Sequence, residues 1–203
     1  MTDTAVQRFY RFHAYVYDAT RWTILHGRRR AIDALHLKPE SSVLEVGCGT
    51  GLNFRLLLDR LDPARGSLTG LDFSQEMLQK ADVRVQRAGW ANVRLVQGDA
   101  TTMQLGRTFD AVLFAYSLTM IPDWQGALRA AHAHLKPGGK LVVLDFGRFE
   151  NWGPLAPVMR AWLRSSHVVT LQPYADEIER IFGNCRRTSC RGGYYFLCEA
   201  DRT

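Results

Sequence analysis

The sequence lacks any long apolar run. Its longest, Ala111–Ile121, has 11 residues and includes Ser117 and Thr119, whereas a membrane-spanning helix needs about 20 predominantly apolar residues. We therefore expect no spanning helix. The first 20 residues also lack the apolar core of a signal peptide, so we expect a cytoplasmic protein.

Cysteine is also scarce. The four cysteines, Cys48, Cys185, Cys190 and Cys198, form no C-x-x-C pair, and no Cys/His spacing typical of a zinc site occurs. We therefore predict no metal and expect the thiols to be buried or unreactive. A chain of 203 residues, 46% hydrophobic and 23% charged, buries a core without such supports and is not disordered throughout.

The excess of basic over acidic residues lies at the two ends of the chain and not in its middle. The net charge is +6; residues 1–38 hold seven Lys/Arg against three Asp/Glu, whereas residues 39–147 hold eleven of each. Such an asymmetry favours an acidic partner, either nucleic acid or anionic lipid. The alternative is a solvated basic face without a partner.

Strand and helix signals alternate after a helical pattern over residues 4–36. The expected strands are Ser42–Val46, Ser67–Leu71, Val93–Gln97, Ala111–Ala115, Lys140–Asp145, Arg186–Cys190 and Gly193–Cys198. The expected helices cover residues 52–61, 74–88 (with Ser74 as N-cap), 123–135, 154–165 and 173–182. This order predicts an α/β, Rossmann-like sheet of seven mostly parallel strands. The short link Arg191–Gly193 predicts an antiparallel C-terminal hairpin.

A glycine-rich turn follows the first expected strand. It reads G-x-G-x-G over residues 47–51, with Leu52 where the dinucleotide pattern would have its third glycine. Glycines at this position let the backbone approach a ligand near a helix N-terminus.

Acidic residues stand at or near the ends of three expected strands. Asp72 can accept both hydroxyls of an adenosine ribose, which NAD and S-adenosylmethionine share. Glu45 precedes the glycines at a buried position, where an unpaired acid is costly. Asp99 is suited to the amine of an adenine. Three acids at this edge favour a positively charged cofactor.

These segments resemble the signature set of class I S-adenosylmethionine-dependent methyltransferases. The resemblance covers Glu45–Gly51, Leu71–Asp72, Gly98–Ala100 and Leu135–Gly139, within about residues 40–147. It implies S-adenosyl-L-methionine as the cofactor and S-adenosyl-L-homocysteine as the product. The cofactor-binding positions it implies are Glu45, Gly47, Cys48, Gly49, Thr50, Gly51, Asn53, Asp72, Phe73, Met77, Asp99, Ala100, Thr101 and Tyr116.

A narrower resemblance is to the bacterial N-methyltransferases that make betaine lipid from diacylglyceryl-homoserine. It rests on Tyr17–Arg21, Tyr116–Trp124, Asp145–Gly147, Ala161–Arg164 and Ser166–Val168. It implies methylation of a lipid-headgroup amine. Phosphatidylethanolamine and quinone methyltransferases are neighbouring families, so a phospholipid amine or a soluble quinone precursor is the alternative acceptor.

Four side chains are candidates for the acceptor side of the reaction. Tyr116 follows the fourth expected strand, where its ring or hydroxyl can contact an amine. Asp145 ends the fifth strand and can orient an amine, and His167 can act as a base. Tyr17 can close over the site. Ordinary packing is the alternative for each.

The chain divides into a helical segment, residues 1–38, and a methyltransferase domain, residues 39–203. The first segment interleaves Arg8, Arg11 and Arg21 with aromatic residues, which is typical of a lid or of a helix on an anionic membrane. We therefore expect a protein that can lie peripherally at the inner membrane face. No Asn/Asp-Pro-Pro-aromatic motif occurs, so we expect no nucleic-acid partner. A cofactor-binding regulator without activity is the remaining alternative.

Overall fold

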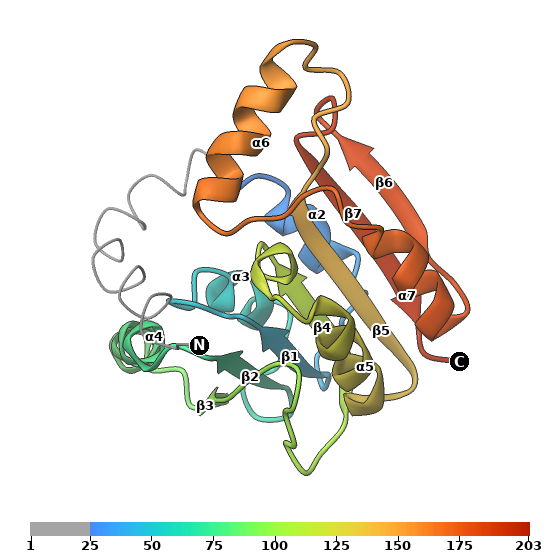
Figure 1. The fold of residues 1–203 in the computed structure, drawn as a ribbon. Helices are drawn as coiled ribbons and strands as arrows, with labels where there is room; N and C mark the ends of the chain where they lie inside the picture. The colour runs from blue at the N-terminus through green and yellow to red at the C-terminus, as the bar shows by residue number, and fades with distance from the viewer. Residues whose placement is uncertain (1–24) are drawn as a thin grey trace.

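The computed structural model describes residues 25–203 (Figure 1), so Tyr17 and the arginines at positions 8, 11 and 21 lie outside the described residues. The strands are β1 (Ser42–Val46), β2 (Ser67–Asp72), β3 (Val93–Gln97), β4 (Phe109–Ala115), β5 (Leu135–Phe146), β6 (Arg186–Cys190) and β7 (Tyr195–Asp201). The helices are α2 (Arg28–Asp33), α3 (Phe54–Leu58), α4 (Gln75–Ala88), the 3-10 helix η1 (Leu118–Met120), α5 (Trp124–His134), α6 (Leu155–Ser165) and α7 (Tyr174–Phe182).

All seven strands form one sheet in the order β3-β2-β1-β4-β5-β7-β6. The pairs from β3 to β5 are parallel, and β7 is antiparallel to both β5 and β6. The predicted Rossmann-like sheet with its antiparallel hairpin is therefore confirmed. The strand order reverses between β1 and β4, and open α/β sheets bind ligands at the carboxyl ends of the strands beside such a reversal.

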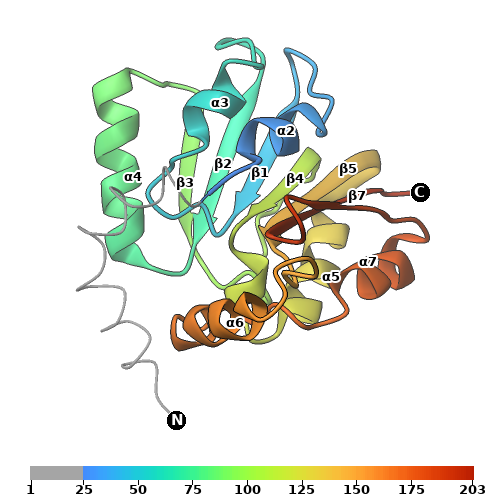
Figure 2. The ribbon, with the colours of Figure 1, turned by 90° about the horizontal axis from the view of Figure 1, so that it is seen from above.

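Helices cover both faces of the sheet. Figure 2 shows α2 and α3 on one side and α5 and α7 on the other. The first side buries Ile32, Phe54 and Leu57 in one apolar cluster, and the second buries Leu128 and Ile178 in another. All residues of β1 are buried, as expected for a central strand with helices on both sides.

The residues just before β1 belong to this core. Leu25, Ala31, Ile32 and Leu35 are buried with side chains of β4 and β5. The part of the predicted N-terminal segment that the structure describes, residues 25–38, therefore packs into the same core as the sheet. No helix among residues 25–203 is long and apolar enough to cross a membrane.

Most element bounds agree with the sequence prediction to within a few residues, and Ser74 is the N-cap of α4, accepting a hydrogen bond from the Met77 amide. Two bounds differ. The helix predicted over 52–61 is limited to α3, because residues 59–61 form a turn. Strand β5 begins at Leu135 because the chain end supplies partners: Gly138 donates to the Arg202 carbonyl, and the Arg202 amide donates to Gly139.

Candidate active site

The glycine turn lies at the carboxyl ends of β1 and β2. The amides of Gly47 and Cys48 both donate to the Leu71 carbonyl, at 2.8 and 3.0 Å. The Gly49 amide donates to Asp72 Oδ2 at 2.7 Å. These bonds fix the turn against the end of β2, next to the point where the strand order reverses.

The three glycines of this turn have different reasons to be glycine. All have positive φ, between 56° and 74°. A Cβ on Gly47 would lie 2.4 Å from Ser117 Cβ, and one on Gly51 would lie 2.7 Å from the Phe54 ring. A Cβ on Gly49 would meet nothing within 4 Å. Gly49 therefore faces open space, where a ligand can approach the backbone.

Asp72 connects the glycine turn to helix α4. Besides accepting from Gly49, its carboxylate accepts from the Ser74 amide through Oδ1 at 2.9 Å. On the other side of the turn, Arg84 Nε donates to the Thr50 carbonyl at 3.0 Å. The turn and the first residues of α4 are thus held as one unit.

Glu45 is the most unusual group at this edge. It is 1% exposed, and its Oε1 accepts from Asn53 Nδ2 at 2.6 Å. Its Oε2 is buried and has no hydrogen-bond partner among the described residues. Burial raises the pKa of Glu45 to about 8, although Asn53 and the nearby Arg28 charge act to lower it. A buried acceptor left this way is costly, so these residues fit a ligand that donates a hydrogen bond.

Arg28 is a site residue that the sequence analysis missed. Its guanidinium donates to the Asn53 side-chain oxygen at 3.4 Å and to the Leu52 carbonyl at 3.3 Å. Burial lowers its pKa, while the Glu45 charge acts to raise it. In the sequence Arg28 counted only toward the basic excess of residues 1–38, and the neighbouring Arg29 and Arg30 gave it no distinguishing feature.

The other predicted cofactor positions lie at the ends of β2 and β3. Asp99 is exposed, and its Oδ1 accepts from the Thr101 amide and hydroxyl at 2.8 and 2.7 Å. Ala100 is half-buried, Phe73 is 47% exposed, and Met77 is buried in the first turn of α4. The Cys48 side chain is buried beside Gly70, so Cys48 faces the open edge only through its backbone.

The Tyr116 side chain is not exposed at the site. It is 5% exposed, its ring packs on Phe146 at 4.8 Å between centroids, and its hydroxyl donates to the His26 carbonyl at 2.6 Å. Burial raises the pKa of this hydroxyl. A contact of this hydroxyl with an amine stays a prediction; in this structure the hydroxyl fastens the segment before α2 to the end of β4.

The Asp145 carboxylate is likewise hydrogen-bonded within the interior of the protein. It is fully buried; Oδ1 accepts from the Thr119 hydroxyl at 2.6 Å and the Phe146 amide at 2.8 Å, and Oδ2 accepts from the Thr119 amide at 3.0 Å. Burial raises its pKa to about 6 despite these bonds. That Asp145 orients an amine stays a prediction; in this structure its carboxylate holds η1 in place and is fully buried.

His167 lies in the turn after α6, exposed and with a φ of 62°. Two residues later, the Val169 amide donates to the Thr119 carbonyl at 3.0 Å, which ties this turn to η1. The structure brings Glu45, the glycine turn and Asp72 together at the ends of β1 and β2, whereas His167 lies in the turn after α6.

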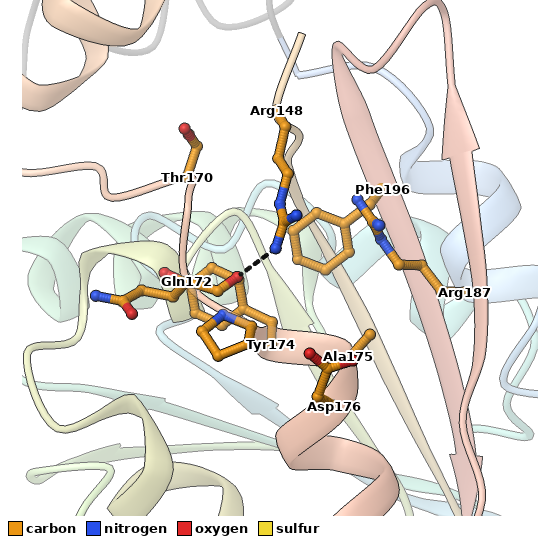
Figure 3. A pocket seen from close by; sticks show the side chains of 9 residues that line it. Arg148, Thr170, Gln172, Tyr174, Ala175, Asp176, Arg187 and Phe196 are labelled. Carbon is orange, nitrogen blue, oxygen red and sulfur yellow. Dashed lines mark hydrogen bonds between the residues drawn. The ribbon is translucent and has the colours of Figure 1, made fainter. Parts of the chain in front are cut away.

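A separate pocket of about 110 Å³ lies between α7 and the β6–β7 hairpin (Figure 3). The stacked rings of Tyr174 and Phe196 line it, with centroids 5.8 Å apart. Arg148 and Arg187 flank these rings; Arg148 donates to the Gln172 carbonyl at 3.4 Å. Its lining residues include none from the glycine turn, so it is a different feature from the site at β1 and β2.

The central part of the chain matches a known family. The family model described as a methyltransferase domain matches residues 43–139. The match includes the glycine turn, Asp72 and Asp99. The similarities support an enzyme, with S-adenosylmethionine as its cofactor.

Relatives of the methyltransferase domain are found among curated proteins and solved structures. Demethylmenaquinone methyltransferase of Staphylococcus epidermidis is 34% identical over 119 residues, 58% of this chain and 48% of its own. A SAM-dependent methyltransferase from Aquifex aeolicus has a TM-score of 0.69 at 20% identity, covering 91% of this chain and 93% of its own.

A third similar structure is 1,6-didemethyltoxoflavin-N1-methyltransferase of Burkholderia thailandensis, with bound S-adenosylhomocysteine. It has a TM-score of 0.67 at 22% identity, covering 98% of this chain and 88% of its own. These structural likenesses bear on the fold. The chain spans about half the length of the curated relatives it matches.

Proposed function

We propose that the protein transfers a methyl group from S-adenosylmethionine to a small-molecule acceptor of the quinone-precursor class. The cofactor half rests on the buried Glu45 Oε2, which has no partner among the described residues and belongs to the residue two positions before the glycine turn. The acceptor half is supported by the relatives, which are named demethylmenaquinone methyltransferases.

The residues at this edge fit the chemical groups of the cofactor. S-adenosylmethionine supplies a methyl group activated by a positively charged sulfur. Asp72 and Asp99 would accept hydrogen bonds from the ribose hydroxyls and the adenine amine. Glu45 would accept from the ammonium of the amino-acid end, and Arg28 would donate to its carboxylate. The open side of Gly49 leaves room for that end.

The remaining work of the protein is alignment and exclusion of water. Holding two reactants in line contributes up to about 7–11 kcal/mol in the best intramolecular cases. Asp145 and Tyr116 serve this task as positioning residues. Asp145 fixes η1 and Tyr116 fixes the segment before α2, so both shape the edge beyond β4 without touching the acceptor.

A lipid-headgroup amine, as in betaine-lipid or phosphatidylethanolamine methylation, is the second candidate acceptor. An amine must lose a proton to be methylated, so a nearby base or water is required. Asp145 and the Tyr116 hydroxyl, two of the predicted amine contacts, are taken up by internal hydrogen bonds. The exposed apolar side chains on α6 favour a lipid environment. The relatives' names favour the quinone precursor, which we therefore rank first.

Acceptor competition tests this proposal. The protein is incubated with methyl-labelled cofactor and, in parallel, with a demethylated quinone precursor in its reduced form, diacylglyceryl-homoserine and phosphatidylethanolamine. Mass spectrometry then identifies the labelled product. Label on the quinone precursor alone supports the proposal, and label on either aminolipid alone makes the lipid amine the acceptor. Asp72→Ala serves as the control for label incorporated without the cofactor site.

A further inference from the structure

Large apolar side chains are exposed mainly on one helix. Leu155, Val158 and Trp162 of α6 are 63%, 67% and 53% exposed, and Leu171 just beyond α6 is 52% exposed. Of the large apolar side chains exposed in residues 25–203, only Phe73 and Val83 lie elsewhere. Spacing of three and four residues puts the α6 side chains on one helix face, while Leu163 is buried on the opposite face. We call Leu155, Val158 and Trp162 the α6 stripe.

The surroundings of the α6 stripe are basic. No Asp or Glu occurs from residue 151 to residue 175, and α6 itself carries Arg160 and Arg164. Arg160 donates to the Arg148 carbonyl at 2.9 Å, a neutral partner that leaves its positive charge in place. The only acid just before this stretch, Glu150, lies 3.4 Å from Arg187. A helix with an apolar stripe, two arginines and no acidic residue is complementary to an anionic surface.

The shape of the stripe restricts what can cover it. Its side chains project from a helix that lies beyond the carboxyl ends of β4 and β5 (Figure 1), whereas the pocket of Figure 3 is lined by other residues. Three partly covered side chains also supply far less than the ~800 Å² per partner of a standard protein interface. A lipid surface adapts to such a ridge, and tryptophan is enriched at the depth of lipid headgroups.

We propose that α6 docks the protein on an anionic bilayer, with the α6 stripe in the interface and Arg164 at the lipid phosphates. Helices of this kind bind through buried apolar area together with attraction to anionic lipid. Docking through α6 turns the carboxyl edge of the sheet toward the bilayer. This inference concerns a surface and does not depend on which acceptor is methylated.

Vesicle flotation of the full chain tests the proposal. We expect at least tenfold stronger binding to phosphatidylglycerol vesicles than to phosphatidylcholine vesicles, decreasing with salt. The triple variant L155S/V158S/W162S should lose at least tenfold in binding, and Arg164→Glu should lose several-fold. The matched control is Val83→Ser, which removes an exposed valine from α4 and should bind as the original protein does.

Two further readouts separate the possible occupants. Brominated phosphatidylglycerol should quench the tryptophan fluorescence of the original protein, and Trp162→Phe should remove most of that quenching. Thermal melting by circular dichroism checks that each variant is folded. Unchanged flotation of the folded triple variant overturns the proposal. A loss of dimer mass in the triple variant with no loss of flotation also overturns it and makes a second copy of the chain the occupant.

Discussion

Two buried carboxylates, Glu45 near the end of β1 and Asp145 near the end of β5, differ in how they are satisfied. Both are at most 1% exposed, and burial raises the pKa of both. Asp145 accepts three hydrogen bonds from η1 and its own strand. Glu45 accepts one from Asn53, and its second oxygen has no hydrogen-bond partner among the described residues. The Asp145 carboxylate therefore has its hydrogen-bond donors within the protein, whereas Glu45 Oε2 can accept a hydrogen bond from a ligand.

This difference separates the two buried acids better than their position in the sheet does. The sequence places both acids at strand ends on the edge where α/β sheets bind ligands, and it assigned a functional role to each. Only the hydrogen-bond inventory distinguishes them. Four predictions test this comparison.

The largest effect should come from Glu45→Gln and should depend on pH. The folded-state pKa of about 8 exceeds the ordinary value of 4.5, so the folded state holds an additional proton between these values. The free energy of unfolding therefore decreases as pH rises through this window. Gln cannot ionise, so the variant should be more stable than the original protein at pH 9 by about 4 kcal/mol, since one pKa unit is worth ~1.4 kcal/mol.

Urea unfolding of the ligand-free protein at pH 5 and pH 9 measures this effect. The difference between variant and original protein should be small at pH 5, where Glu45 is protonated in the folded state. Asp145 titrates in both proteins, so its contribution cancels in the comparison. A pH-independent difference would mean that Glu45 is already paired in the folded protein, and the comparison with Asp145 would fail.

Asp72→Ala should weaken binding of S-adenosylhomocysteine about 100-fold. Hydrogen bonds to a charged group are worth about 1.5–3 kcal/mol each, and two ribose hydroxyls would lose their acceptor. Calorimetry measures the affinity. The matched control is Asp123→Ala, which also removes a carboxylate from a helix N-terminus, where it accepts from the Gly126 amide. That control should lose stability but keep its affinity; equal losses in both variants would refute the ribose role.

Asp145→Asn should lower the free energy of unfolding by about 2 kcal/mol and leave the affinity for S-adenosylhomocysteine unchanged. In Asn one carboxylate oxygen of Asp145 is replaced by an NH₂ group, which cannot accept a hydrogen bond. A buried N–H or O–H donor that bonds to this oxygen in the original protein is then left unpaired. Thr119→Val removes only the hydroxyl bond and should cost about half as much. Urea unfolding and calorimetry give the two quantities. If the variant keeps its stability but loses methyl transfer, Asp145 takes a direct part in the reaction.

Local patterns predicted much of the fold. The strand order follows from alternating signals, and the Ser74 cap and the glycine turn are encoded within a few residues. The early start of β5 was missed because Lys136–Gly139 has the composition of a loop. Residues Gly138 and Gly139 of this segment form backbone hydrogen bonds with Arg202 near the end of the chain. The local sequence of the segment cannot predict such a distant partner.

The candidate site was predictable where its residues act through their own position in the chain. The Gly49 and Asp72 contact follows from adjacent parallel strands. The contact of Arg28 with Asn53 joins residues 25 positions apart and depends on the path of the chain before β1. The Asp145 carboxylate is satisfied only because η1 folds over it. Both outcomes depend on tertiary contacts that residue type and spacing do not specify.

The smallest of the four effects concerns Arg28 and tests whether the group around Glu45 recognises an amino-acid end. Arg28 reaches Glu45 through Asn53, so a guanidinium and a carboxyl group lie side by side. Decarboxylated S-adenosylmethionine keeps the ammonium and lacks the carboxylate. The original protein should therefore prefer S-adenosylmethionine over this analogue by about tenfold, since a charge-assisted hydrogen bond is worth about 1.5–3 kcal/mol and Arg28 is only half-buried.

Arg28→Met should abolish the preference by weakening the binding of S-adenosylmethionine alone, as calorimetry with both ligands will measure. The neighbouring Arg29→Met, at an exposed position, should keep it. If Arg28→Met weakens the binding of both ligands equally, Arg28 supports the turn through Leu52 and Asn53 and does not contact the carboxylate.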